Sequence, residues 1–246
     1  MNEVILKNKK KFIEVLKSYH ISEHAKKVLD EVNYVVLIGP AAGGRNTIIN
    51  HLVLTKNYMQ VVSDTTRPPK LRDGKMEIDG VNYYFRSEEG FLEDLEHGEF
   101  LEAELIHGQQ VSGTSIRELE KVTALNGVGI NEVEFGGAQN ILEAKPDTKV
   151  IAILPSSPQI WLDRFTKREK ISREEFFNRI NTAKKVIELA RNEPRVTLVV
   201  NHEYHKAAEV VDRIVQGGEL TEVEKAESQT LLHQFDMKID ELLRSS

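Results

Sequence analysis

A glycine-rich stretch near the start of the chain has the residue types needed to bind an anion. It reads Gly39-Pro40-Ala41-Ala42-Gly43-Gly44-Arg45-Asn46-Thr47 and follows an apolar run, Tyr34-Val35-Val36-Leu37-Ile38. We expect a helix to begin near Thr47. A turn between a buried strand and a helix directs backbone N–H groups and the helix N-terminus at a bound phosphate. A turn with only a structural role has the same local pattern, so the stretch does not decide the function by itself.

The stretch has the frame of the phosphate-binding loop G-x-x-x-x-G-K-[ST], with two departures. Arg45 stands at the lysine position, and its planar guanidinium is bulkier than an ammonium group, so it need not reach the same phosphate oxygens. Asn46 stands at the position of the metal-binding hydroxyl, although an amide oxygen can also ligate a hard cation. We expect weakened metal binding, with Asn46 as the candidate metal ligand.

Four further motifs follow the loop in a fixed order. They are Ser63-Asp64-Thr65-Thr66-Arg67-Pro68-Pro69-Lys70, Asp79-Gly80-Val81-Asn82-Tyr83-Tyr84-Phe85, Gly98-Glu99-Phe100-Leu101-Glu102, and His107-Gly108 with Gly113-Thr114-Ser115. In order and spacing the chain resembles the guanylate kinase family over about residues 34–215. The resemblance implies an α/β fold of the P-loop nucleoside-monophosphate-kinase type: a parallel sheet with helices on both faces, a small inserted monophosphate-binding region and a helical lid.

The resemblance also implies a GMP site. Arg67 and Lys70 would hold the monophosphate, with Tyr83 donating its hydroxyl. The guanine would be read by donors toward its O6 and by carboxylate acceptors for its N1 and N2 hydrogens; the donors are Ser63 and Thr114, and the acceptors are Glu102 and Glu134. A buried carboxylate can accept both guanine hydrogens together, which adenine could not satisfy, so Glu102 would set the specificity. Taken singly, Arg67 could be a solvated cation and Glu102 a carboxylate at the rim of a site.

The ATP site implied by the resemblance consists of Gly39, Gly43, Gly44, Arg45, Asn46, Thr47 and Asn201. Arg45, Arg168 and Arg179 would be catalytic, because cations at the lid stabilise charge on the transferring phosphoryl group. Arg168 also fits a solvated basic helix face, and an asparagine at a strand end, such as Asn201, is a common turn former. Two more positions depart from the family: Ser112 replaces a second tyrosine in a segment one residue longer than usual, and Gly136 stands where glutamine is common.

Two functions are compatible with these features. The first is phosphoryl transfer from ATP to GMP, giving ADP and GDP with Mg²⁺ as cofactor. The second is a catalytically inactive guanylate-kinase-like module that binds GMP or an acidic or phosphorylated partner, since the loop is altered. A kinase for another monophosphate is disfavoured by Glu102 together with Ser63 and Thr114.

The elements that must position these residues alternate between strands and helices. Strands are expected at Val128 to Phe135, Val150 to Leu154 and Val196 to Val200, which favours a parallel sheet. We divide the chain into an N-terminal helical extension (1–33), the guanylate-kinase-like domain (34–216) and a C-terminal amphipathic helix (217–246). Within the domain, residues 61–115 form the GMP-binding region and residues 164–180 the lid region.

Composition limits the class of protein. The 246 residues carry a net charge of -6, which argues against an extended basic surface for nucleic acid. The absence of cysteine excludes disulfides and thiolate metal sites, and the sequence shows neither a signal peptide nor a membrane span. We therefore expect a soluble cytoplasmic protein, with its terminal helices available for self-association or for a protein partner. Trp161 is expected to pack rather than to recognise a ligand.

Overall fold

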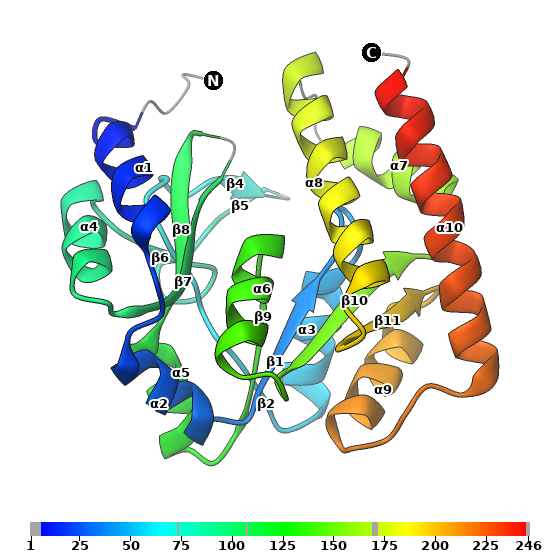
Figure 1. The fold of residues 1–246 in the computed structure, drawn as a ribbon, viewed down its shortest axis with the longest axis horizontal. Coiled ribbons are helices and arrows are strands. Elements are labelled where there is room, and N and C mark those ends of the chain that lie inside the picture. Colours follow the sequence, from blue (N-terminus) through cyan, green and yellow to red (C-terminus); the bar gives the residue numbers. More distant parts are fainter. Residues whose placement is uncertain (1–5, 73, 107, 169–171, 245–246) are drawn as a thin grey trace. The chain divides into compact units, whose positions relative to one another are not determined.

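The computed structural model describes residues 6–72, 74–106, 108–168 and 172–244 as two compact units (Figure 1). The first unit comprises residues 1–34, 59–129 and 139–146. The second unit comprises residues 35–58, 130–138 and 147–246. The N-terminal helices thus belong to the first unit and the C-terminal helix to the second.

A five-stranded sheet carries the glycine-rich loop. Its strand order is β11-β10-β1-β9-β2, formed by β11 (Val196–Asn201), β10 (Lys149–Pro155), β1 (Tyr34–Ile38), β9 (Val128–Glu132) and β2 (Tyr58–Gln60). Strands β1, β2 and β9 contain residues of both units. β10 pairs in parallel with β1 on one side and with β11 on the other. All residues of β1 are buried, as expected for a parallel strand covered on both faces.

The helices of the second unit are α3 (Arg45–Thr55), α7 (Pro158–Arg168), α8 (Arg173–Asn192), α9 (Tyr204–Val215) and α10 (Glu222–Arg244). α6 (Phe135–Ala144) contains residues of both units. α3 packs beside α9, and α10 runs beside α8 (Figure 1). The alternation of strands and helices confirms the predicted α/β class, with a parallel sheet flanked by helices.

The C-terminal helix α10 is amphipathic, as its sequence predicts. Leu231, Phe235 and Ile239 are buried and recur every four residues, which places them on one face. The Ser228 hydroxyl donates to the Leu198 carbonyl at 3.0 Å, and Lys184 pairs with Asp240 at 2.9 Å. The apolar stripe is therefore covered by the chain's own second unit.

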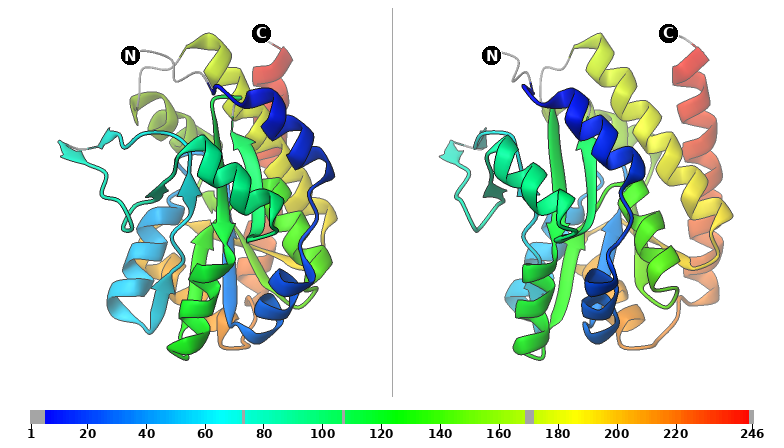
Figure 2. Two further views of the ribbon diagram at one scale, coloured as in Figure 1. Left: turned by 90° about the vertical axis from the view of Figure 1, so that its left-hand side faces the viewer. Right: turned by 60° about the vertical axis from the view of Figure 1, so that its left-hand side comes forward.

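The described part of the first unit contains a smaller sheet and four helices. The sheet order is β6-β3-β8-β7, formed by β6 (Tyr84–Phe85), β3 (Asp64–Thr65), β8 (Gln110–Ser115) and β7 (Phe100–Ile106). The helices are α1 (Lys9–Ser18), α2 (Glu23–Glu31), α4 (Glu88–Glu96) and α5 (Ile116–Ala124). A separate hairpin of β4 (Leu71–Arg72) and β5 (Lys75–Met76) extends away from the other strands of this unit (Figure 2).

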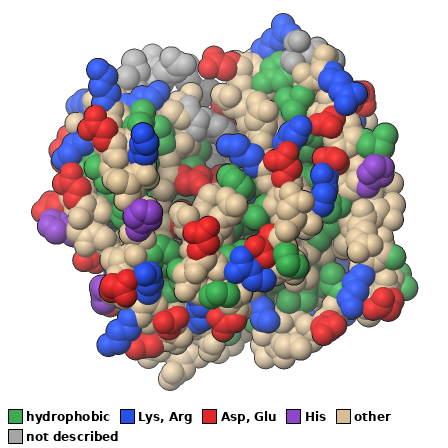
Figure 3. All heavy atoms as spheres, in the orientation of Figure 1, with side chains coloured by type: hydrophobic (Ala, Val, Ile, Leu, Met, Phe, Trp, Pro, Cys, Tyr) green, Lys and Arg blue, Asp and Glu red, His purple; other side chains and the backbone are tan. Residues whose placement is uncertain are grey.

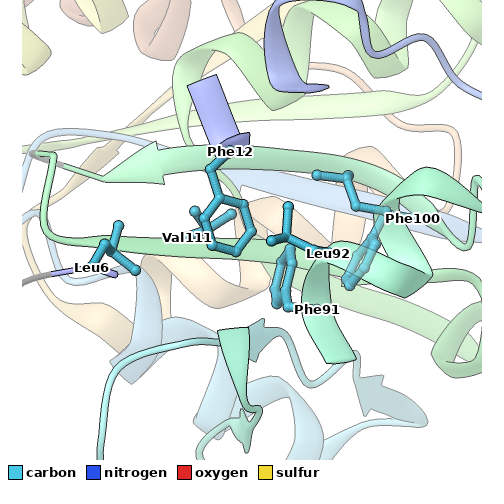
Figure 4. Close-up of a cluster of buried hydrophobic side chains, with 7 residues drawn as sticks. Leu6, Phe12, Phe91, Leu92, Phe100 and Val111 are labelled. Atoms are coloured by element: carbon cyan, nitrogen blue, oxygen red, sulfur yellow. The ribbon is translucent and has the colours of Figure 1, made fainter. Parts of the chain in front are cut away.

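Aromatic side chains fix α1 onto the smaller sheet. Phe12 meets Phe91 edge-on with ring centroids 6.0 Å apart, and Phe91 stacks on Phe100 at 4.4 Å. Leu6, Leu92, Leu95 and Val111 complete this cluster (Figure 4). The N-terminal extension is therefore part of the core of the first unit.

Two element boundaries differ from the expectation. The strand predicted from Val128 to Phe135 ends at Glu132, because the Glu134 carbonyl accepts from the Ala138 amide and so begins α6. The helix expected near Thr47 begins two residues earlier, at Arg45.

No helix in the described ranges is long and apolar enough to cross a membrane. On the face drawn in Figure 3, basic and acidic side chains are interspersed.

Candidate nucleotide-binding sites

Two predicted guanine-reading residues lie side by side in the first unit. Glu102 on β7 and Thr114 on β8 are partners in the antiparallel register, and the Thr114 hydroxyl donates to the Glu102 carboxylate at 2.7 Å. Both side chains are buried. A buried carboxylate needs hydrogen-bond donors, and the Thr114 hydroxyl supplies one of them. A carboxylate has two oxygens that only accept hydrogen bonds, which is the chemistry that suits a ligand with adjacent N–H groups.

Ser63 is brought to the same strands by the backbone. It directly precedes β3, whose first residue Asp64 pairs with Gly113, the neighbour of Thr114. Asp64 itself is fully buried and pairs with both Arg86 and Arg117 at 2.5 Å. Burial raises the pKa of Asp64 above its ordinary value, although the two guanidinium groups act in the opposite direction. These two ion pairs with the buried Asp64 fix β3 in the sheet and with it the position of Ser63.

Arg67 lies in a second cluster of the same unit. Its guanidinium donates to both oxygens of Glu77, at 2.5 and 2.9 Å, and to the Pro68 carbonyl at 3.0 Å. It also lies over the Tyr83 ring, 4.7 Å from the centroid. Arg67 is buried, so the description of a solvated cation does not fit it. The bonds to Glu77 and Pro68 occupy three of the five guanidinium N–H groups, which leaves two for a phosphate.

Glu77 organises this cluster. Besides Arg67, its carboxylate accepts from the Lys70 backbone amide at 2.9 Å, and its side chain is 4% exposed. Glu77 therefore joins Lys70, which stands before the β4–β5 hairpin, to the cluster of Arg67 and Tyr83. Ser63 and Arg67 are four residues apart, so the guanine-type and phosphate-type clusters are within about 14 Å of each other along the chain.

The glycine-rich loop belongs to the second unit, and its glycines are required by close backbone approach. A Cβ on Gly39 would lie 2.5 Å from the Ile153 carbonyl oxygen. Gly44 has φ 95° at the N-terminus of α3, and a Cβ there would lie 2.3 Å from the Asn201 amide nitrogen. The N-cap of α3 is Gly44, which has no side chain to bond to the first turn, so these amides are available to an anion.

The two unusual loop residues share one carboxylate. Arg45 Nε lies 3.3 Å from a Glu132 oxygen, and its side chain is 14% exposed. With the Asn46 amide oriented to donate, its nitrogen lies 3.0 and 3.1 Å from the two Glu132 oxygens. Glu132 thus holds both side chains at the start of α3. Thr47 is exposed on the same first turn.

The oxygens of Asn46 and Glu132 are of the kind that Mg²⁺ prefers. Within the described ranges, no group of three or more His, Asp or Glu side chains is arranged to hold a metal ion. Mg²⁺ bound mainly by nucleotide phosphates, with one or two protein oxygens, fits this donor set.

Asn201 lies at the loop backbone. Its amide nitrogen donates to the Gly43 carbonyl at 3.0 Å, and the residue is buried at the end of β11. The predicted place of Asn201 in the ATP site stays a prediction. Trp161 on α7 donates its indole N–H to the Ala41 carbonyl at 2.9 Å and is fully buried. The expectation that Trp161 packs is confirmed, and the bond to the loop adds a role that its sequence context did not predict.

Three of the remaining predicted residues lie in the second unit as well. Arg179 on α8 donates to Glu175 at 2.7 Å and lies over the Phe165 ring, 5.8 Å from its centroid. Arg168 is the last residue of α7, and its side chain is outside the described part of the structure. Glu134 stands directly before α6, two residues after Glu132. His107, in the segment before Gly113, is also outside the described residues.

Three contacts at these sites were not predicted from the sequence. Glu77 could have been suspected as an acidic residue ten positions after a predicted phosphate-binding arginine, but nothing in the spacing shows that the two pair. Glu132 is the last residue of β9, two residues before the predicted Glu134, yet no sequence pattern shows that it pairs with Arg45. The bond from Trp161 to Ala41 joins residues 120 positions apart, and no local pattern predicts it.

Comparisons with known proteins agree on one family. Residues 31–217 match the family model described as Guanylate kinase. A protein named guanylate kinase from Corynebacterium diphtheriae is 34% identical over 186 residues, which cover 74% of this chain and 94% of that protein. Another from Histophilus somni is 30% identical over 84% of this chain and 98% of its own length. A guanylate kinase structure from Anaplasma phagocytophilum superimposes with a TM-score of 0.57 at 22% identity, covering 80% of this chain and 92% of that one, and supports the fold.

Proposed function

Because this chain belongs to the guanylate kinase family, we propose that it transfers the γ-phosphoryl group of ATP to GMP and releases ADP and GDP. The observation that carries the proposal is the extent of the family match, which runs through residues 31–217 and so includes both nucleotide-binding regions. No finding from the comparisons favours the inactive binding module. We further propose a cytoplasmic location, where both nucleotides are available.

The first unit supplies the acceptor site in this proposal. The Glu102 carboxylate accepts the guanine N1 and N2 hydrogens, and Thr114 and Ser63 donate toward O6. An adenine base would leave the carboxylate without its donors, which is costly for a buried charge. Arg67, held by Glu77, presents its two remaining N–H groups to the monophosphate, with Lys70 and Tyr83 beside it. The short bidentate pair with Glu77 fixes the guanidinium in advance, so less side-chain entropy is lost on binding.

The second unit supplies the donor site. The amides at the start of α3 and the Arg45 guanidinium bind the triphosphate, and Arg179 and Arg168 act on the transferring group. A GMP phosphate oxygen forms a bond to the γ-phosphorus while the bond from that phosphorus to the β-bridging oxygen breaks, and ADP leaves with the electron pair. Since the three equatorial oxygens carry most of the charge, catalysis depends on cations and amides placed around them. Mg²⁺, when bound with ATP, would neutralise charge on the β- and γ-phosphates, with Asn46 and Glu132 as the protein oxygens that suit it.

A coupled assay for ADP and GDP formation tests the proposal. The wild-type chain is mixed with ATP, GMP and Mg²⁺, and AMP replaces GMP in the control. We expect GDP with GMP and at least a hundredfold lower rate with AMP. Arg45→Ala should lower kcat by about 10²- to 10³-fold, as loss of a cation or donor at a developing charge does. If calorimetry detects GMP binding but no GDP forms at any ATP concentration, the proposal is wrong.

A further inference from the structure

The glycine-rich loop is held from outside by two buried side chains. Trp161 donates to the Ala41 carbonyl at 2.9 Å, and Asn201 donates to the Gly43 carbonyl at 3.0 Å. These two carbonyls flank Ala42, a non-glycine residue with φ 63°. An alanine in the left-handed region is strained and persists only where its surroundings fix it. The hydrogen bonds from Trp161 and Asn201 restrain the backbone on both sides of Ala42.

The same bonds orient the amides of the loop. In a trans peptide the carbonyl of one residue and the N–H of the next point in opposite directions. The Ala41 carbonyl faces Trp161, so the Ala42 N–H points away from it. The Gly43 carbonyl faces Asn201, so the Gly44 N–H points away from the Asn201 side chain. Fixing the carbonyls therefore fixes the donors that a phosphate would meet.

Trp161 is in turn fixed by the C-terminal helix. Its ring lies 5.5 Å from the ring of Phe235 on α10, and 5.9 Å from that of Phe165 on its own helix. Trp161 and Phe235 are both fully buried. Helix α10 begins at Glu222, after the end of the family match at residue 217. The residue that holds one side of the loop thus packs on an element outside the matched domain.

Helix α10 is also bonded to β11, the strand that carries Asn201. Ser228 donates to the Leu198 carbonyl on β11, three residues before Asn201. On the other side, Asp236, the residue after Phe235, pairs with Arg191 of α8 at 2.7 Å. The helix is therefore fixed against both α8 and β11 on either side of the Trp161 contact.

We propose that α10 positions the triphosphate loop through Phe235 and Trp161, so that this C-terminal helix sets the affinity for the donor nucleotide. Trp161 and Phe235 are positioning residues, because neither is placed against the substrate. The proposal rests on the proposed function in one respect, namely that ATP is the ligand of the loop. According to the proposal, α10, which lies outside the family match, changes the affinity for ATP and leaves the affinity for GMP unchanged.

Calorimetric titration of the full chain with ATP and Mg²⁺, and separately with GMP, tests the proposal. Trp161→Phe keeps an aromatic ring and removes the indole N–H; we expect the Kd for ATP to rise roughly five- to tenfold, the effect of one lost hydrogen bond, with the Kd for GMP unchanged. Phe235→Leu should raise the Kd for ATP about threefold without touching the loop itself. Phe12→Leu, a fully buried phenylalanine on the terminal helix α1 of the first unit, is the matched control and should leave the Kd for ATP unchanged.

Trp161 is the single tryptophan of the chain, so its fluorescence reports on the loop without any need for turnover. We expect its emission to change on addition of ATP with Mg²⁺ and to change in Phe235→Leu even without nucleotide. Equal losses of ATP and GMP affinity in Trp161→Phe, or an unchanged Kd for ATP in both variants, would overturn the proposal, as would a wild-type chain that does not bind ATP. A wild-type chain that binds ATP but forms no GDP would refute the proposed function alone, and the binding comparison would still decide the role of α10.

Discussion

At the scale of single residues, two buried carboxylates of the first unit, Glu77 and Glu102, have partners of different charge. Glu77 is already neutralised by Arg67 through two bonds, whereas Glu102 has a bond from the neutral hydroxyl of Thr114. Glu77 holds the Arg67 guanidinium in place, whereas in the proposed function Glu102 accepts hydrogen bonds from guanine. The two residues therefore predict different mutant phenotypes.

Replacement of Glu102 should affect recognition of guanine. Glu102→Gln keeps the shape and can still accept from Thr114, but it replaces one acceptor oxygen with a donor that faces the guanine hydrogens. We expect kcat/KM for GMP to fall about 10- to 100-fold, with little change in KM for ATP. Steady-state kinetics with each nucleotide varied in turn measures both. An equal rise of the two KM values would instead indicate a general loss of structure.

Replacement of Glu77 should affect stability as well as GMP binding. Glu77→Ala leaves the Arg67 guanidinium buried without its main partner, and breaking such a pair costs about 3–5 kcal/mol. Urea denaturation of the variant measures this loss, and KM for GMP should rise with it. The exposed pair of Glu23 and Lys26 is the control, because Glu23→Ala should change stability by less than about 1 kcal/mol. A loss in Glu77→Ala as small as in the control would show that the buried pair is not stabilising.

The sequence could predict those residues of the candidate site that stand in recognisable motifs. Thr114 and Glu102 were expected together, and the register of β7 and β8 places them together. The residues that hold the site, such as Glu77, Glu132 and Trp161, could not be predicted, because their partners are chosen by packing. Element boundaries followed local signals less closely, as the early start of α6 at Phe135 shows. Hydrophobic spacing did predict α10, because its buried stripe is continuous.

At the scale of elements, the loop before α3 carries an alanine in a conformation that favours glycine. Ala42→Gly should remove the strain of φ 63°, which costs an L-residue about 1–2 kcal/mol, against an entropic penalty of about 0.5–1 kcal/mol for glycine. We expect stability that is unchanged or about 1 kcal/mol higher. The same change at Ala183 inside α8 should destabilise by at least about 1 kcal/mol, because glycine lowers helix propensity and a buried methyl group is lost. Thermal unfolding of both variants measures the change in their free energy of unfolding. A destabilised Ala42→Gly would show that the loop conformation is not strained.

The segment after α1 is joined to the smaller sheet by a buried phenol. Tyr19 donates its hydroxyl to the Phe100 carbonyl, and burial raises the pKa of Tyr19 to about 12. An unfolded tyrosine ionises near pH 10, so the native state keeps its proton where the unfolded state loses it. This contribution to stability is complete below about pH 10 and is lost as pH rises toward 12. The pKa of Tyr58 is also raised, by burial and by Asp212, so it acts in the same direction.

Denaturation of Tyr19→Phe between pH 9 and 12 isolates the contribution of Tyr19. The variant should be less stable than wild type at pH 9, because it lacks the bond to Phe100, and its stability should fall less steeply above pH 10. Tyr58→Phe should behave in the same way, independently of Tyr19. Parallel pH profiles for wild type and Tyr19→Phe would contradict the assigned pKa.

At the scale of the whole molecule, each terminal extension belongs to a different unit. The N-terminal helix α1 completes the core of the first unit through Phe12, and α10 completes that of the second through Phe235. The predicted donor-site residues lie in the second unit, and those for the acceptor, except Glu134, lie in the first. A substitution that destabilises the core of one unit should therefore weaken the binding of that unit's nucleotide more than that of the other.

Phe12→Ala tests this division by native-state hydrogen exchange. The cavity should cost about 3–5 kcal/mol, and we expect the amides of β7 and β8 to exchange faster while those of β10 and β11 change less. GMP at a hundred times its Kd should restore about 2.7 kcal/mol of protection to β7 and β8, because a ligand stabilises the state that binds it. ATP with Mg²⁺ should instead protect the first turn of α3. Uniform acceleration throughout the chain, reversed equally by either nucleotide, would mean that the two cores unfold as one.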